Sequence, residues 1–95
     1  MVSSTEAKIL SLLIARPKGS YASELLHASG GTLKRGSVYT TLSRMEKAGL
    51  VKGVEEAPTE AYALPRTLYR ITGHGVAARN EFGAYTGFLT RAEAA

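Results

Sequence analysis

Apolar residues near the N-terminus recur at the spacing of one helix face. Four of them predict the buried side of a helix over Ser4–Ala15, namely Ile9, Leu10, Leu13 and Ile14. Ser3 and Glu6 stand three residues apart, which is the pattern of a capping box at a helix start. The helix is expected to end before Pro17, because proline disfavours helical backbone at the residue that precedes it.

A second and shorter helix is predicted over Tyr21–Ser29, with Ser20 as its N-cap. Its inner side is expected to consist of Ala22, Leu25, Leu26 and Ala28. The pair Gly30-Gly31 ends it, since glycine readily adopts the left-handed conformation that follows a helix.

A third helix is predicted over Gly36–Ala48. Val38, Leu42 and Met45 lie at positions i, i+4 and i+7 and therefore face the core. Gly49 follows as a natural end of the helix.

From Leu50 onward the pattern changes to short strands, predicted over Leu50–Glu55 and Thr67–Thr72. The segment between them contains two prolines and has no period, so it is expected to be the loop of a hairpin. Thr72 is then expected to cap a last helix over Gly73–Ala92. One face of this helix carries a row of apolar residues: Ala78, Phe82, Tyr85 and Leu89.

Three helices, a hairpin and a final helix follow the order of a winged helix-turn-helix. The predicted fold is therefore mainly α with a small β-hairpin (α+β), and the 95 residues suffice for one such module. We expect residues 1–72 to form the winged helix-turn-helix and residues 73–95 to form a helix that dimerises. The predicted dimer contacts are Ala78, Phe82, Tyr85, Phe88 and Leu89.

The positive charge of the chain is concentrated on the third predicted helix and its flanks. Residues 34–52 hold five Lys or Arg against the single acid Glu46, a net charge of +4 that equals the net charge of the whole chain. Such a basic patch is the electrostatic footprint of a polyanion partner. The outward side of the helix adds small hydroxyl residues and a glycine that lets the backbone come close. The candidate DNA-binding residues are Lys34, Arg35, Gly36, Ser37, Tyr39, Thr40, Thr41, Arg44, Lys47 and, on the wing, Arg66.

Other classes of function lack the residues that they require. The chain has no cysteine, no aspartate and two histidines, so few residues could form a metal site or an acid–base centre. We find no phosphate-binding loop, nucleophile elbow or catalytic triad order, and expect neither an enzyme nor a cofactor. No apolar run approaches the roughly 20 residues of a membrane span, and no signal peptide is evident. A cytoplasmic protein is expected.

The residues from Ser29 to Gly75 resemble the PadR family of regulators at three places. The family pattern SGG-x-L-x-x-G-S/T-L/V-Y is similar to Ser29–Tyr39. Its continuation L-x-x-LE-x-x-GLV is similar to Leu42–Val51, and its wing pattern R-x-x-YRLT-x-x-G is similar to Arg66–Gly75. Upstream, Leu10–Ala15 followed by Tyr21 is similar to the family's first helix and its GYEL segment, so the resemblance covers nearly the whole chain in the right order.

This resemblance implies a dimeric transcription factor, usually a repressor, that pairs through its C-terminal helix and binds double-stranded DNA. It leaves open a small aromatic effector at the dimer interface. The chain departs from the family where Lys34-Arg35 replaces Ser-Pro and where Thr40 replaces proline, so its operator preference is expected to lie at these residues. The alternative reading is a winged-helix module that binds a protein and no DNA.

Overall fold

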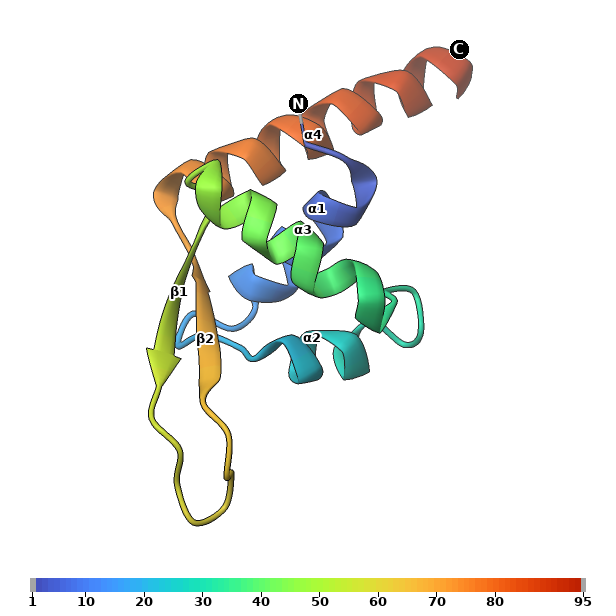
Figure 1. Cartoon of the computed structure of the whole chain (residues 1–95). Helices are drawn as coiled ribbons and strands as arrows, with labels where there is room; N and C mark the ends of the chain where they lie inside the picture. The colour runs from blue at the N-terminus through green and yellow to red at the C-terminus, as the bar shows by residue number, and fades with distance from the viewer. Residues whose placement is uncertain (1, 95) are drawn as a thin grey trace.

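The computed structural model describes residues 2–94, and the side chains of residues 2–83. Its elements run in the predicted order, with three helices, a two-stranded hairpin and a last helix (Figure 1). The elements are α1 Ser4–Ile14, α2 Ala22–Ala28, α3 Arg35–Lys47, β1 Val51–Glu56, β2 Arg66–Ile71 and α4 Gly73–Ala94. The predicted mainly α fold with one hairpin is confirmed.

Helix α1 begins as its sequence predicts. The Ser3 hydroxyl accepts a hydrogen bond from the Glu6 N–H at 3.1 Å, and the Glu6 carboxylate accepts one from the Ser3 N–H at 2.9 Å. These reciprocal bonds satisfy two backbone donors that a helix start leaves free. Three of the four expected apolar residues are fully buried, whereas Ile14 is exposed at the last position of the helix.

Helix α2 differs from the prediction at its start and on one face. Ser20 does not cap it, because the Ser20 backbone instead pairs with Tyr69 of β2 through two N–H···O bonds of 2.9 Å. The helix begins after Tyr21, whose N–H donates to the Glu24 carboxylate at 3.0 Å. Ala28, expected on the inner side, is exposed. The pairing of Ser20 with β2 is a long-range contact, and the residues around Ser20 in the sequence do not indicate it.

Helix α3 packs on α2 and on β1, and its buried stripe closes the core. Val38, Leu42 and Met45 are 1% exposed or less, as predicted. Gly30, Gly31 and Gly49 all have positive φ, so the turns before and after α3 have the left-handed residues that were expected. Together α2 and α3 form the helix pair of a helix-turn-helix.

The strands pair antiparallel, with Val51 opposite Ile71 and Glu56 opposite Arg66. Thr72 then caps α4, since its hydroxyl accepts from the Gly75 N–H at 3.0 Å. The same hydroxyl donates to the Gly49 carbonyl at 2.6 Å, which joins the end of α3 to the start of α4.

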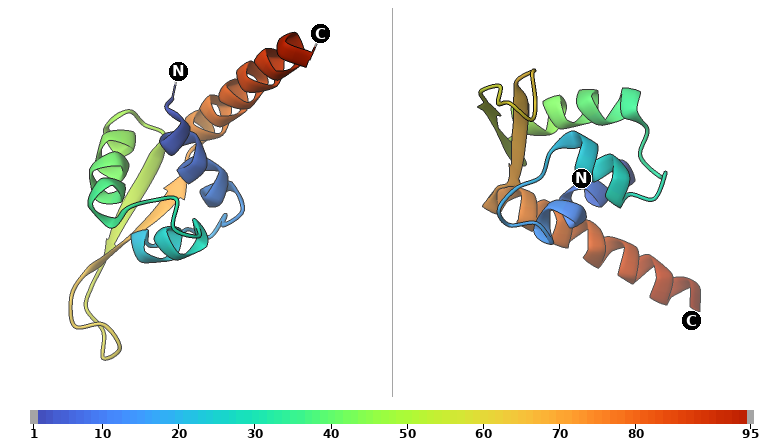
Figure 2. Two further views of the ribbon diagram at one scale, coloured as in Figure 1. Left: turned by 90° about the vertical axis from the view of Figure 1, so that its right-hand side faces the viewer. Right: turned by 90° about the horizontal axis from the view of Figure 1, so that it is seen from below.

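The first turns of α4 lie against α1, where the Arg79 Nε donates to the Ser11 hydroxyl at 3.0 Å. Further along, α4 extends beyond the three-helix body, and the hairpin loop extends in another direction (Figures 1 and 2). Within the described part of the chain, no helix is both long enough and apolar enough to cross a membrane.

Candidate nucleic-acid interface

The outward face of α3 is a shallow groove of hydroxyl and basic side chains. Its volume is about 450 Å³, and its lining residues are Tyr39, Thr40, Ser43, Arg44 and Lys47. All five are exposed, with Tyr39 at 54%. Hydroxyl and cationic groups of this kind bind phosphates and the edges of bases.

The N-terminal end of α3 continues this face. Lys34 precedes the helix, Arg35 is its first residue, and the next two residues, Gly36 and Ser37, are exposed as well. A Cβ added at Gly36 would meet no atom within 4 Å, so this end of the helix is open to solvent. The first turn contains no acid, and the positive end of the helix dipole there favours an anion.

Thr41 is the exception among the candidate DNA contacts. It is 8% exposed and lies on the buried side of α3. Thr41 stands three residues after Val38 and four before Met45, so it shares the helix face of the core residues. The prediction that Thr41 contacts DNA is therefore corrected.

Glu46, the one acidic residue among residues 34–52, is bound to the neighbouring strand β1. A carboxylate oxygen of Glu46 accepts a hydrogen bond from the Gly53 N–H of β1 at 2.9 Å. The groove lining contains no carboxylate. The negative charge of Glu46 therefore lies toward β1, and the electrostatic potential over the groove remains positive.

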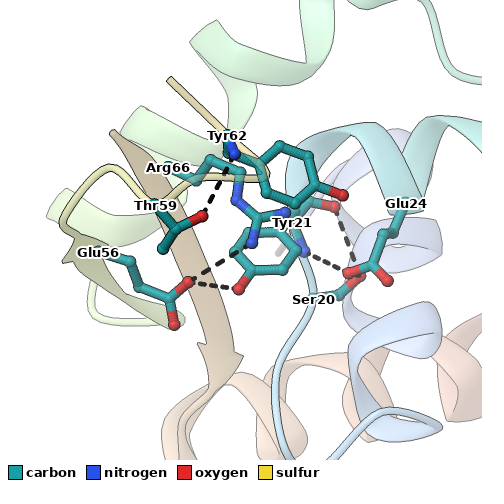
Figure 3. Close-up of polar contacts among 7 residues, drawn as sticks. All are labelled: Ser20, Tyr21, Glu24, Glu56, Thr59, Tyr62 and Arg66. Atoms are coloured by element: carbon teal, nitrogen blue, oxygen red, sulfur yellow. Dashed lines mark hydrogen bonds and ion pairs between the residues drawn. The ribbon is translucent and has the colours of Figure 1, made fainter. Parts of the chain in front are cut away.

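The wing residue Arg66 is half-buried. Its guanidinium carbon lies 3.9 Å from the ring centre of Tyr21 and 3.5 Å from that of Tyr62. One guanidinium nitrogen is 4.0 Å from the Glu56 carboxylate (Figure 3). The Tyr21 hydroxyl donates to the same carboxylate, and this hydrogen bond is the main reason that the pKa of Tyr21 is raised above its usual value.

A larger cavity of about 660 Å³ lies between α2, α3 and the wing. Four tyrosines line it, Tyr21, Tyr39, Tyr62 and Tyr69, together with Arg66 and shorter residues. Burial raises the pKa of Tyr69 as well. Neither Tyr62 nor Glu56 was predicted from the sequence to belong to this site. The available signals were the short spacing of Tyr62 and Arg66 and the charge of Glu56 on the facing strand.

The expected dimer contacts fall in two groups. Ala78 is half-buried and packs against the core of its own domain, where the first turns of α4 cross α1. Phe82 is half-buried beside Ser4, Ala7 and Ser11 of α1. Tyr85, Phe88 and Leu89 have side chains outside the described residues.

Among the residues that the structure describes, no three His, Cys, Asp or Glu side chains gather as metal ligands. His27 and His74 are both exposed, one near the end of α2 and one near the start of α4.

The helix pair, the exposed basic third helix and the hairpin define a winged-helix DNA-binding domain. Residues 9–81 match the family described as the transcriptional regulator PadR-like family. The chain belongs to this family, whose members regulate transcription and are not enzymes. No curated protein matches the chain by sequence.

Solved structures share this fold. A PadR-like transcription factor from Bacteroides fragilis has a TM-score of 0.78 and 25% identity, covering 93% of this chain and 84% of its own. A transcriptional regulator from Clostridium thermocellum has a TM-score of 0.74 and 26% identity, covering 92% and 86%. The PcaV regulator from Streptomyces coelicolor, solved with its natural ligand, has a TM-score of 0.76 and 22% identity. That match covers 96% of this chain but only 60% of the PcaV chain.

Proposed function

We propose that this chain is a repressor that binds a pseudo-palindromic DNA duplex as a homodimer, with α3 in the major groove. The observation that carries the proposal is the α3 groove, where Tyr39, Thr40, Ser43, Arg44 and Lys47 gather without a carboxylate. An α-helix fits the major groove of B-DNA, and its side chains then reach both phosphates and base edges.

The residues divide by the contact that each is suited to make. Lys34 and Lys47 lie at opposite ends of α3, where they can neutralise phosphates on the two sides of the groove. Thr40 lies in the middle of the exposed face and Arg44 lies in the last turn of α3, and both can reach base edges. Arg35 stands at the open N-terminal end, where the helix backbone adds its own attraction for a phosphate.

The proposal that two copies pair rests on the shape of α4. This helix has 22 residues, and its C-terminal part leaves the body of the domain (Figure 2). Isolated helices are marginal in water, and Gly83 and Gly87 each weaken α4 by about 1 kcal/mol relative to alanine. A second copy of the helix would supply packing contacts along α4. Two α3 helices would then meet major grooves about one helical turn apart.

A selection of bound duplexes from a random pool tests the function directly. We expect the recovered sequences to contain two inverted half-sites whose centres lie about 10 base pairs apart. Binding should weaken steeply as salt rises, because phosphate contacts release counterions. Recovery of no shared sequence, together with equal retention on heparin and on duplex DNA, would refute sequence-specific recognition. It would favour the alternative of a protein-binding winged helix.

Replacing Leu89 by glutamate is expected to give monomers. Leu89 lies seven residues after Phe82 on the same predicted face of α4, and a buried carboxylate there would oppose pairing. Leu89 is the cleaner position, since Phe82 also lies beside α1 of its own domain. Light scattering measures the mass. Asn80→Glu is the matched control, because it adds the same charge at an exposed position of α4. A dimer that persists in L89E contradicts pairing through this face.

A further inference from the structure

The guanidinium of Arg66 lies against two tyrosine rings that come from separate segments of the chain. Tyr21 precedes α2, Tyr62 belongs to the loop between the strands, and Arg66 is the first residue of β2. Figure 3 shows the two tyrosine rings on either side of the guanidinium. Their ring centres lie 3.9 and 3.5 Å from its central carbon, well within the range of cation–π attraction. We call this arrangement the tyrosine–arginine stack.

Glu56 joins the stack from the last position of β1, directly opposite Arg66 in the hairpin. It accepts the hydrogen bond of the Tyr21 hydroxyl and pairs with Arg66 at 4.0 Å. Tyr21, Glu56 and Arg66 therefore contact one another in a closed ring. Through this ring the start of α2 is connected to both strands of the wing.

Tyr62 connects the loop to the same point. The loop turns tightly just before it: Thr59 N–H donates to the Tyr62 carbonyl at 2.8 Å, and Tyr62 N–H donates to the Thr59 carbonyl at 3.2 Å. The Thr59 hydroxyl accepts from the Tyr62 N–H as well, at 3.2 Å. The nine residues between the strands are thus folded back, and the Tyr62 ring rests on Arg66.

These contacts leave Arg66 poorly suited to hold DNA. Both faces of its guanidinium are covered, and a carboxylate already lies beside it. A DNA phosphate would have to compete with Glu56 for the N–H donors at the edge of the guanidinium, while the two rings restrict its movement toward DNA. The stack also lies in the wall of the 660 Å³ cavity, which has Tyr39 of α3 on one side and Thr67 of β2 on another. Its position therefore sets how far the wing stands from the recognition helix.

We propose that Arg66 is a positioning residue, which fastens the wing to the start of α2 through the tyrosine–arginine stack and makes no contact with DNA. The inference rests on the proposed function, because it concerns how α3 and the wing are presented together to one duplex. It also gives Tyr62 and Glu56 a role: they hold the guanidinium that aligns the wing.

The chemistry of the stack separates it from a phosphate contact. The planar guanidinium of arginine can stack against one ring on each of its two faces. The ammonium group of lysine is a compact point charge and cannot stack between two rings in this way. R66K would therefore preserve a phosphate contact but lose the stack. The salt dependence of binding separates the two roles as well, since each lost phosphate contact lowers the slope of log K against log salt by about 0.9.

We would titrate a selected duplex with the full-length wild type, R66A, R66K, Y62A and the R66A/Y62A double variant, at several salt concentrations. We expect R66A, R66K and Y62A each to bind about tenfold more weakly, with the slope unchanged. The double variant should also bind about tenfold more weakly and not a hundredfold, because both changes remove one stack. Y62F keeps the ring, and L64A changes a loop residue that is 76% exposed, so both should bind as wild type.

A measurement without DNA tests the stack itself. The guanidinium signals of Arg66 in an NMR spectrum should be shifted upfield by the two rings and should return toward ordinary values in Y62A. In R66K, the backbone amide of Tyr62 should exchange with solvent at least tenfold faster.

The outcomes separate the inference from the proposed function. Wild-type affinity in R66K, with a slope lowered by about 0.9 in R66A, would show that Arg66 binds a phosphate and would overturn the inference alone. Unshifted Arg66 signals in the wild type would overturn it too. A wild-type chain that binds no duplex would refute the proposed function, and with it the role in alignment, even where the NMR signals showed an intact stack.

Discussion

The double substitution of Arg35 and Arg44 by alanine is expected to weaken binding to a selected duplex by about thirtyfold or more. Both residues are exposed on α3, one at its open N-terminal end and one in the groove. Each lost contact of an arginine with a phosphate or guanine costs about 1–3 kcal/mol. Their distance along the helix makes the two losses close to additive.

An anisotropy titration at several salt concentrations measures both the affinity and the kind of contact. If both arginines bind phosphates, the slope of log K against log salt should fall by about 1.8. If Arg44 reads a base instead, the slope should fall by about 0.9, and the preference at one position of the half-site should relax. Binding that remains within threefold of the wild type would contradict recognition through α3.

Lys8→Ala is the matched control for lost positive charge. Lys8 is exposed on α1, beside α4 and away from the groove of α3. It should change affinity by less than about threefold, since distant surface charges are screened at physiological salt. Circular dichroism and thermal unfolding should show that both variants remain folded.

The second large effect is expected from Gly75→Ala. Alanine favours a helix over glycine by about 1 kcal/mol, so propensity alone would predict a more stable protein. The structure predicts the opposite. A Cβ at Gly75 would lie 2.1 Å from the Leu50 carbonyl oxygen and 2.8 Å from a side-chain carbon of Ile71. The nearest of these atoms belongs to the backbone and cannot swing aside, so α4 itself must move.

We expect G75A to lower the free energy of unfolding by about 3 kcal/mol, which outweighs the gain in propensity. In a domain of this size the melting temperature should fall by roughly 10 °C or more. Calorimetry or thermal circular dichroism at fixed protein concentration measures the effect, because dimerisation makes stability depend on concentration.

Gly73→Ala is the matched control, two residues earlier in the same first turn of α4. No atom lies within 4 Å of a Cβ built there. Its effect should stay within about 0.5 kcal/mol of zero. Equal stability of G75A and G73A would show that the close approach of α4 to Leu50 is not needed.

Local signals in the sequence predicted the elements well where neighbouring residues carry the information. The capping box of Ser3 and Glu6 is made by residues three apart. Val38, Leu42 and Met45 mark one helix face by their spacing. Glycines with positive φ stand where the turns need them. In each case the physical cause lies within about one turn of the chain, so the pattern and the structure agree.

The errors occur where a distant segment decides. Ser20 reads as a helix cap, yet its backbone pairs with Tyr69 of β2. Thr41 reads as the edge of a polar face, yet the elements around α3 leave it 8% exposed. Hydroxyl residues serve equally well in caps, in cores and on surfaces, so their type does not reveal which neighbour they will meet.

The sequence by itself determined the order of the elements, the basic outward face of α3 and the membership of the chain in a family of transcription regulators. Only the tertiary structure decided the place of Arg66. Its partners come from the start of α2, the end of β1 and the loop, and Tyr21 is 35 residues from the carboxylate that accepts its hydrogen bond. Aromatic faces and charges attract one another in many combinations, so residue types alone do not indicate which side chains Arg66 will contact. The pairing of β1 with β2, and of β2 with Ser20, brings these particular side chains together.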